Sequence, residues 1–186
     1  MNKTQLQNRS EANWKPWSRL HHADVDAACL SWLLDIGSLT QRLIAACDGQ
    51  FKVEVLGEYW QKPMQSERRA LGLRQGQLAR IRQVRLLCNG KPRVFARTVI
   101  PHSTLKGSVR RLNMLGNKPL GAVLFADPTM RRGVMEIASL NKNNFLYDIA
   151  MKSLKNKKTI WGRRSVFYLS GKPLLVNEIF LPGINQ

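Results

Sequence analysis

The sequence has 186 residues, which is enough for one domain with a sizeable core, and 44% of them are hydrophobic. Thirty Lys and Arg against twelve Asp and Glu give a formal net charge of +18, which fits an anionic partner or a basic, solvated surface. The sequence lacks zinc-finger spacing and RNA-binding signatures, so nucleic acid is not the expected partner. It also lacks an apolar run of the ~20 residues that span a membrane, and its first residues are too polar for a secretory signal peptide.

The cysteine content predicts a reducing environment. Cys29, Cys47 and Cys88 are odd in number, and each lies among apolar neighbours. Such residues are typical of reduced thiols in the core of a cytoplasmic protein.

Two helices are predicted near the N-terminus. The first covers residues 24–35, with Asp24 as its N-cap and apolar side chains along one face. The second covers residues 38–47, where Ser38 and Gln41 have the spacing of a capping box.

Strands are predicted next. Residues 51–60 alternate between apolar and polar side chains, and the polar, basic residues 61–77 are expected to form a connection. Residues 78–88 and 93–100 flank Asn89-Gly90, which is a strong signal for a two-residue hairpin turn.

The middle of the chain predicts short elements. Residues 101–116 and 118–125 have the pattern of two short helices separated by Gly116. Residues 129–139 fit either a strand or a short helix. Residues 141–158 are rich in lysine, with a weak apolar stripe, and fit a solvated loop or a surface helix in weak contact with an anionic membrane.

The last hairpin is predicted over residues 160–182, with its turn at Ser170-Gly171-Lys172-Pro173. Period-2 alternation in its second strand places Glu178 on an apolar face together with Leu174, Val176 and Phe180. The pattern as a whole predicts an α+β fold, with an antiparallel sheet of about five or six strands and helices at the N-terminus. A polar arm over residues 1–22 is expected to precede a single domain over residues 23–186.

Familiar catalytic and cofactor motifs are missing from the sequence. Val166 and Pro173 replace required positions of a P-loop around Ser170-Gly171-Lys172, and neither a dinucleotide-binding glycine pattern nor a nucleophile elbow occurs. The histidines and cysteines lack metal-ligand spacing, so we expect no metal.

Two charged residues on apolar strand faces remain as candidates for a site. Arg82 shares its strand face with Val84, Leu86 and Cys88, and Glu178 occupies a similar position on its own strand. Arg82 is the natural counterpart of Glu178. From spacing alone, the pair fits a structural salt bridge about as well as a small apolar pocket with one cation and one acceptor.

Several blocks of sequence resemble the chorismate lyase family and occur in the family's order. They are Arg82-Gln83-Val84-Arg85-Leu86-Leu87-Cys88-Asn89-Gly90, Ala96-Arg97-Thr98-Val99-Ile100-Pro101, Lys118-Pro119-Leu120-Gly121, Trp161-Gly162-Arg163-Arg164-Ser165, Leu169-Ser170-Gly171-Lys172-Pro173-Leu174-Leu175 and Glu178-Ile179-Phe180-Leu181-Pro182. The segment 141–158 departs from the family as an insertion, and the strong basic charge is not a family requirement.

The resemblance implies conversion of chorismate to 4-hydroxybenzoate and pyruvate, the first committed step of ubiquinone biosynthesis, without a cofactor. It also implies a buried ligand under helical flaps. The family's ligand-contacting arginine falls on Arg82 and its glutamate on Glu178. Its main-chain contacts fall on Leu120 and, in place of the usual methionine, on Leu39. Arg97 is a weaker candidate for the enolpyruvyl carboxylate, and a solvated position is the alternative for it.

A binding module is the rival interpretation. The same fold serves as the effector-sensing domain of a group of bacterial transcription factors, and a charge of +18 would suit a protein associated with DNA. The segment that precedes the fold is too short for a DNA-binding domain, which favours the lyase. We expect a monomer.

Overall fold

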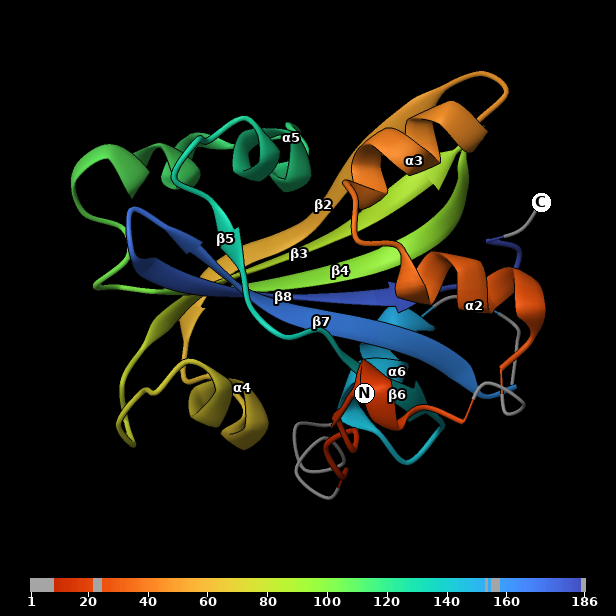
Figure 1. Cartoon of the computed structure of the whole chain (residues 1–186), viewed down its shortest axis with the longest axis horizontal. Coiled ribbons are helices and arrows are strands. Elements are labelled where there is room, and N and C mark those ends of the chain that lie inside the picture. Colours follow the sequence, from red (N-terminus) through yellow and green to blue (C-terminus); the bar gives the residue numbers. More distant parts are fainter. Residues whose placement is uncertain (1–8, 22–24, 153, 155–157, 185–186) are drawn as a thin grey trace.

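The computed structural model describes residues 9–21, 25–152, 154 and 158–184, and an antiparallel sheet forms its centre (Figure 1). Eight strands pair in the order β1-β6-β7-β8-β4-β3-β2, with β5 added beside β7. The strands are β1 (Lys15–Pro16), β2 (Phe51–Gln61), β3 (Ala79–Cys88), β4 (Lys91–Pro101), β5 (Arg131–Arg132), β6 (Glu136–Leu140), β7 (Ile160–Leu169) and β8 (Lys172–Phe180).

The α+β class is confirmed, but the predicted count of five or six strands is wrong. Two of the eight strands, β1 and β5, are only two residues long, and so short a pairing leaves no alternation in the sequence. The stretch 129–139, predicted as strand or helix, supplies β5 and most of β6.

Two tight turns fix the registers of the long strands. Asn89 and Gly90, at φ of 50° and 75°, join β3 to β4 as the sequence predicts. Ser170 and Gly171, at φ of 48° and 73°, join β7 to β8. The central residues of this turn therefore lie one position earlier than Gly171 and Lys172, the centre of the predicted four-residue turn. Left-handed φ at both central residues is the turn geometry that matches strand twist.

Helices cover both faces of the sheet. They are α2 (Ala27–Leu34), α3 (Leu39–Ala46), α4 (Gln65–Ala70), α5 (Leu120–Phe125) and α6 (Phe145–Ala150), with short 3-10 helices η1 (Trp17–Arg19) and η3 (Gly107–Met114). Figure 1 shows α3 and α5 on one face and α4 and α6 on the other. The helices in the described segments are all too short or too polar to cross a bilayer.

The two predicted N-terminal helices are present with small changes at their starts. Asp24 lies outside the described residues, and Asp26 is the N-cap of α2, accepting a hydrogen bond from the Ala28 amide at 3.0 Å. Ser38 caps α3 and accepts from the Gln41 amide at 3.4 Å. Cap side chains of this kind satisfy amides that a first helical turn leaves without partners.

Two segments that were predicted as loosely structured are tied to the sheet. Residues 61–77 contain α4, which the polar sequence did not indicate. Within residues 9–21, β1 pairs with β6, and the Glu11 carboxylate accepts from the amides of Gln65 and Ser66 at 2.7 Å each. The boundary between arm and domain at residue 22 stays a prediction.

The lysine-rich stretch contains a helix that packs into the core. Leu146, Tyr147 and Ala150 of α6 are buried in a cluster beneath the sheet. Phe145, Ile149 and Leu154, which form the predicted apolar stripe, are partly buried against the same cluster. Part of the lysine-rich end lies outside the described residues.

Arg97 does not face the candidate site, and it is not solvated. Its side chain lies on the α4 face of the sheet and is 1% exposed. The guanidinium donates to both carboxylate oxygens of Glu67, at 2.8 and 3.1 Å, and Asn177 also donates to Glu67. The weaker assignment of Arg97 to a substrate carboxylate is therefore wrong, because strand alternation directs it to the opposite face from Thr98.

The prediction of three reduced thiols is wrong for two of them in this structure. Cys47 follows α3 and Cys88 ends β3, and a disulfide joins them across a Cα–Cα distance of 5.5 Å. The pairing depends on α3 meeting the end of a strand 41 positions away, which no local pattern indicates. Cys29 is a free, buried thiol, and burial together with Asp26 raises its pKa to about 11.

The Glu67–Arg97 pair should be a major contributor to stability. Glu67→Ala leaves a buried guanidinium without its counter-ion, so we expect the free energy of unfolding to fall by ~3–5 kcal/mol in urea denaturation. Glu54→Ala is the control, because Glu54 is 46% exposed and 3.9 Å from Arg85, and it should cost less than ~1 kcal/mol. Equal losses in the two variants would contradict this account.

Candidate functional site

A largely apolar cavity of about 50 Å³ lies between the sheet and the helices α3 and α5. Its walls come from β2, β3, β4, β7, β8, α3 and α5, with Pro119 just before α5. The lining residues are Leu39, Thr40, Val53, Arg82, Val84, Leu86, Ala96, Thr98, Pro119, Leu120, Gly121, Leu124, Phe125, Phe167, Val176 and Glu178. The four predicted site residues, Leu39, Arg82, Leu120 and Glu178, are all among them.

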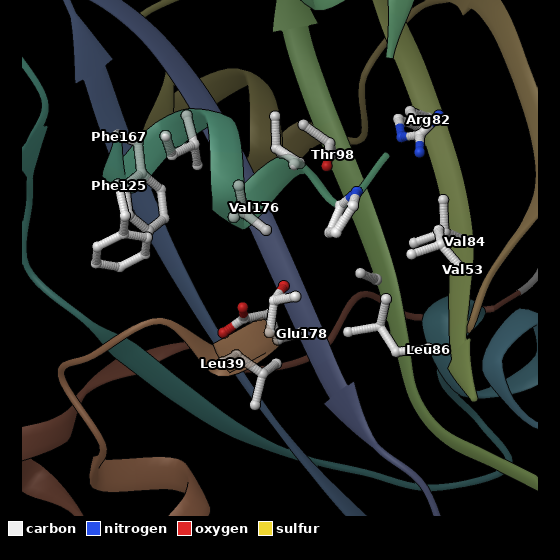
Figure 2. Close-up of a pocket in the computed structure, with 16 residues that line it drawn as sticks. Leu39, Val53, Arg82, Val84, Leu86, Thr98, Phe125, Phe167, Val176 and Glu178 are labelled. Carbon is white, nitrogen blue, oxygen red and sulfur yellow. The ribbon is translucent and has the colours of Figure 1, made fainter. Parts of the chain in front are cut away.

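Arg82 and Glu178 lie at different sides of this cavity. Figure 2 shows Arg82 on β3 and Glu178 on β8, with β4, the strand that carries Thr98, between them. Of the two alternatives for this pair, the structural salt bridge between Arg82 and Glu178 is therefore not formed. Each residue has a different partner. Mainly apolar side chains of the sheet line the cavity between the two charged groups.

Arg82 is held by a carboxylate that the sequence analysis missed. Its side chain is 3% exposed and donates to Glu58 on β2 and to the Lys118 carbonyl, the latter at 3.2 Å. Glu58 also accepts from Arg80 at 2.5 Å. One carboxylate thus bridges two guanidinium groups, and this end of the cavity keeps a net positive charge.

A β-bulge explains why Glu58 was overlooked. The register of β2 against β3 shifts between Val55 and Gly57. The shift moves the even-numbered Glu58 to the face occupied by Val53 and Val55, where it lies opposite Arg82. Simple alternation predicts the other face.

Glu178 is held by Arg163, the neighbouring residue on β7. The Arg163 Nε donates to Glu178 Oε2 at 2.6 Å, and Arg163 is 1% exposed. Its Nη1 also donates to the carbonyls of Trp32, at 2.9 Å, and Asp35, at the end of α2. A cation at a helix C-terminus is favourable, so Arg163 connects α2 with Glu178.

The other Glu178 oxygen is available to a ligand. Glu178 Oε1 makes no hydrogen bond to the described part of the chain, and the side chain is 17% exposed. An apolar cavity with an acceptor oxygen at one side and a cation at the other suits a compact, ring-shaped anion that carries a hydroxyl group.

Leu39 and Leu120 are the first residues of α3 and α5. Main-chain amides in a first helical turn have no partner within the helix, so both positions can offer N–H groups to a ligand. The two helices approach closely at Gly121, where a methyl group would lie 2.9 Å from Thr40 Oγ1. Glycine is needed there for contact between the helices rather than for its backbone angles.

The described residues hold no group of three or more His, Cys, Asp or Glu side chains that could bind a metal. The charged groups at the cavity are arginines paired with carboxylates. Such a wall recognises and orients an anion.

A family model described as chorismate lyase matches residues 8–186. The chain therefore belongs to the chorismate lyase family. A probable chorismate pyruvate-lyase from Methylococcus capsulatus is 42% identical over 154 residues, which cover 83% of this chain and 94% of the relative. A relative with the same description from Nitrosospira multiformis is 34% identical over 185 residues, which cover 99% of this chain and 98% of the relative.

Solved structures with a similar fold come from transcription regulators. The effector domain of PhnF from Mycobacterium smegmatis aligns with a TM-score of 0.57 at 13% identity, covering 80% of this chain and 91% of that domain. The ligand-binding domain of a putative GntR-family regulator from Bordetella bronchiseptica aligns with a TM-score of 0.54 at 15% identity, covering 73% and 87%. At these identities the likeness concerns the fold alone.

The Glu58 bridge should make stability depend on acidic pH. Burial opposes ionisation of Glu58, but hydrogen bonds from Arg80 and Arg82 outweigh it and lower the pKa of Glu58. A lowered pKa in the folded state stabilises the protein above the unfolded pKa of ~4.3, and this contribution is lost as pH falls through the folded value. Glu58→Gln should therefore reduce the free energy of unfolding most near pH 7.

Urea denaturation of both proteins from pH 7 to pH 3 measures this difference, which should shrink as pH falls. Glu54→Gln on the same strand is the control, and it should have little effect at any pH because exposed pairs contribute little. A Glu58→Gln difference that stays constant with pH would contradict the bridge.

Proposed function

We propose that this chain is a chorismate pyruvate-lyase that converts chorismate to 4-hydroxybenzoate and pyruvate. The observation that carries the proposal is the presence of Arg82 and Glu178 at different sides of one apolar cavity in a member of the chorismate lyase family. The activity follows from family membership and from relatives described as chorismate pyruvate-lyases at about 40% identity.

The substrate's chemistry matches the two ends of the cavity. Chorismate has a ring carboxylate, a ring hydroxyl at the opposite side and an enolpyruvyl ether on the carbon beside that hydroxyl. In the reaction the ether C–O bond breaks and the ring carbon that bears the hydroxyl loses its proton. Enolpyruvate leaves with the bonding electron pair and takes up a proton to become pyruvate, and the ring becomes aromatic.

Arg82 would bind the ring carboxylate. Its planar guanidinium can donate two parallel hydrogen bonds to a carboxylate, and Glu58 and the Lys118 carbonyl hold it in one orientation. Because Arg80 shares Glu58, the bridge does not neutralise this end of the cavity. An anion is therefore attracted to it.

Glu178 would accept a hydrogen bond from the ring hydroxyl that becomes the phenol. Arg163 occupies Oε2, which leaves Oε1 for the substrate. The apolar walls between Arg82 and Glu178 would then hold the ring in a reactive conformation and exclude water. Much of the acceleration would come from this positioning.

A ligand must displace α5 or α3 to enter. A cavity of about 50 Å³ is smaller than the ~300–1,000 Å³ of ligand pockets. The segment η3–α5, which corresponds to the predicted flap over residues 101–125, carries Pro119, Leu120 and Gly121 of the cavity wall. We infer that this segment opens for exchange and closes over the bound substrate.

The setting of the enzyme follows from the same proposal. The reaction is an elimination that needs no cofactor, and we expect a monomer in the cytoplasm. The buried apolar side chains of α6 pack into the core, so they are not available to a lipid surface. Weak contact with an anionic membrane would therefore depend on the basic charge alone, and liposome co-sedimentation tests it.

Incubation of the purified protein with chorismate tests the activity, and it should yield 4-hydroxybenzoate and pyruvate in equal amounts. Arg82→Ala should lower kcat/KM by roughly 100-fold or more, as loss of a charge-assisted hydrogen-bonded pair implies. The fold should survive because Glu58 keeps Arg80 as a partner. Arg82→Lys should restore little, because a point charge lacks the planar fork.

Near-normal turnover by Arg82→Ala would refute its assignment. Binding of 4-hydroxybenzoate by the wild-type protein without any turnover of chorismate would instead indicate a ligand-sensing module.

Glu178→Gln tests the acceptor role with little change in shape. The amide oxygen can still accept from Arg163, so the melting temperature should change little. Turnover should fall by roughly 10- to 100-fold, the range for loss of a hydrogen bond to a charged group. Glu178→Leu should in addition destabilise the fold, since it leaves Arg163 Nε without an acceptor. Full turnover per folded molecule in Glu178→Gln would reduce Glu178 to a structural ion-pair partner.

A further inference from the structure

The proposed substrate has two carboxylates, and the assignments above use only one of them. If the ring carboxylate lies at Arg82 and the hydroxyl at Glu178, the second carboxylate must lie near Glu178, because the enolpyruvyl group is attached beside the hydroxyl. The charge of Arg163 is already paired with the Glu178 carboxylate, and its Nη1 donates to main-chain carbonyls at the end of α2. Another cation is needed at this end.

Arg132 on β5 lies against the wall of the cavity near Glu178. Its Nε donates to Ser165 Oγ at 3.0 Å, and its guanidinium carbon is 5.2 Å from the centre of the Phe167 ring. Phe167 lines the cavity, and Ser165 pairs in register with Val176, which also lines it. Arg132 therefore stands directly behind the cavity wall.

The charge of Arg132 is not neutralised by a carboxylate. In the described part of the chain, no Asp or Glu oxygen lies within 4.0 Å of it, whereas Arg82 and Arg163 each form an ion pair. Burial and the nearby Arg163 lower the pKa of Arg132, and Glu178 and Asp35 offset this only in part. An incoming carboxylate would relieve the excess positive charge.

Arg132 also lines a second hollow, of about 300 Å³. The other lining residues are mainly apolar, and they include Trp17, Leu34, Ile36 and Val134. The Arg132 guanidinium lies over Phe167 in the cavity wall and also lines this hollow. In this position it can meet the enolpyruvyl group that projects from the substrate ring.

We propose that Arg132 binds the enolpyruvyl carboxylate of the substrate and so allows the enzyme to distinguish substrate from product. The inference rests on the proposed lyase function. It replaces Arg97, which lies on the opposite face of the sheet, by an arginine on the correct face. 4-Hydroxybenzoate lacks this carboxylate, so it would not engage Arg132 and would be held at Arg82 and Glu178 alone.

A purely structural role for Arg132 makes a different prediction. Its Nη1 donates to the Ile36 carbonyl at 3.1 Å, and with the Ser165 contact it links β5 to the loop after α2. Loss of that link would disturb Phe167 and the cavity, and it would weaken the binding of product and substrate together. Separate measurements for the two ligands therefore distinguish the roles.

The test compares kinetics for chorismate with the affinity for 4-hydroxybenzoate measured by calorimetry. Arg132→Gln should lower kcat/KM by about 10- to 100-fold, while the Kd for 4-hydroxybenzoate stays within about twofold of wild type. Arg82→Ala should weaken both. Arg131→Gln is the matched control, because Arg131 is the exposed neighbour on the same strand and should change neither value.

Arg132→Lys retains the charge and guards against a folding defect in the glutamine variant, and it should keep more of kcat/KM than Arg132→Gln. Unchanged kcat/KM in Arg132→Gln would overturn the proposal. Parallel losses for chorismate and 4-hydroxybenzoate in both Arg132 variants would also overturn it, in favour of the structural role. A wild-type protein that fails to convert chorismate would refute the lyase function instead.

Discussion

The buried guanidinium of Arg163 is the group on which the arrangement of the site depends. A charge this deeply buried is tolerated only when acceptors surround it, and here a carboxylate and the last carbonyls of α2 supply them. The same contacts orient Glu178 and fix the end of α2 against β7. Since α3 begins shortly after α2, the helix that carries Leu39 is positioned from the same point. One side chain thus couples a helix terminus, a catalytic candidate and a cavity wall.

The sheet separates recognition from structural support by using its two faces. Neighbouring residues on one strand serve different purposes, as Thr98 lines the cavity while Arg97 forms the ion pair beneath it. Asn177 and Glu178 show the same division on β8, since Asn177 donates to Glu67 and Glu178 lines the cavity. The buried pair on the α4 face therefore supports the strands without entering the site.

Much of the fold could be predicted from local patterns. Both hairpins, the Ser38 cap and the shared strand faces of Arg82 and Glu178 follow from turn residues and alternation, which act over a few positions. The partners of those charges could not be predicted. Arg163 reaches Glu178 only because β7 and β8 pair in one register, and α4 forms where its polar sequence is anchored by Glu67 beneath the sheet. Such features depend on tertiary contacts that leave no period in the sequence.

The bulge in β2 determines which face of the sheet Glu58 occupies. Upstream of it, odd-numbered positions face the cavity, and downstream of it the even-numbered Glu58 does. If the strand at its present length paired without the bulge, Gly57 would lie opposite Arg82 and Tyr59 would exchange faces with Glu58. Substitutions at Glu58 change the site gradually, whereas regular pairing at unchanged chain length would remove the counter-ion of Arg82 in a single step. At this chain length, the position of Glu58 in the site therefore depends on the bulge itself.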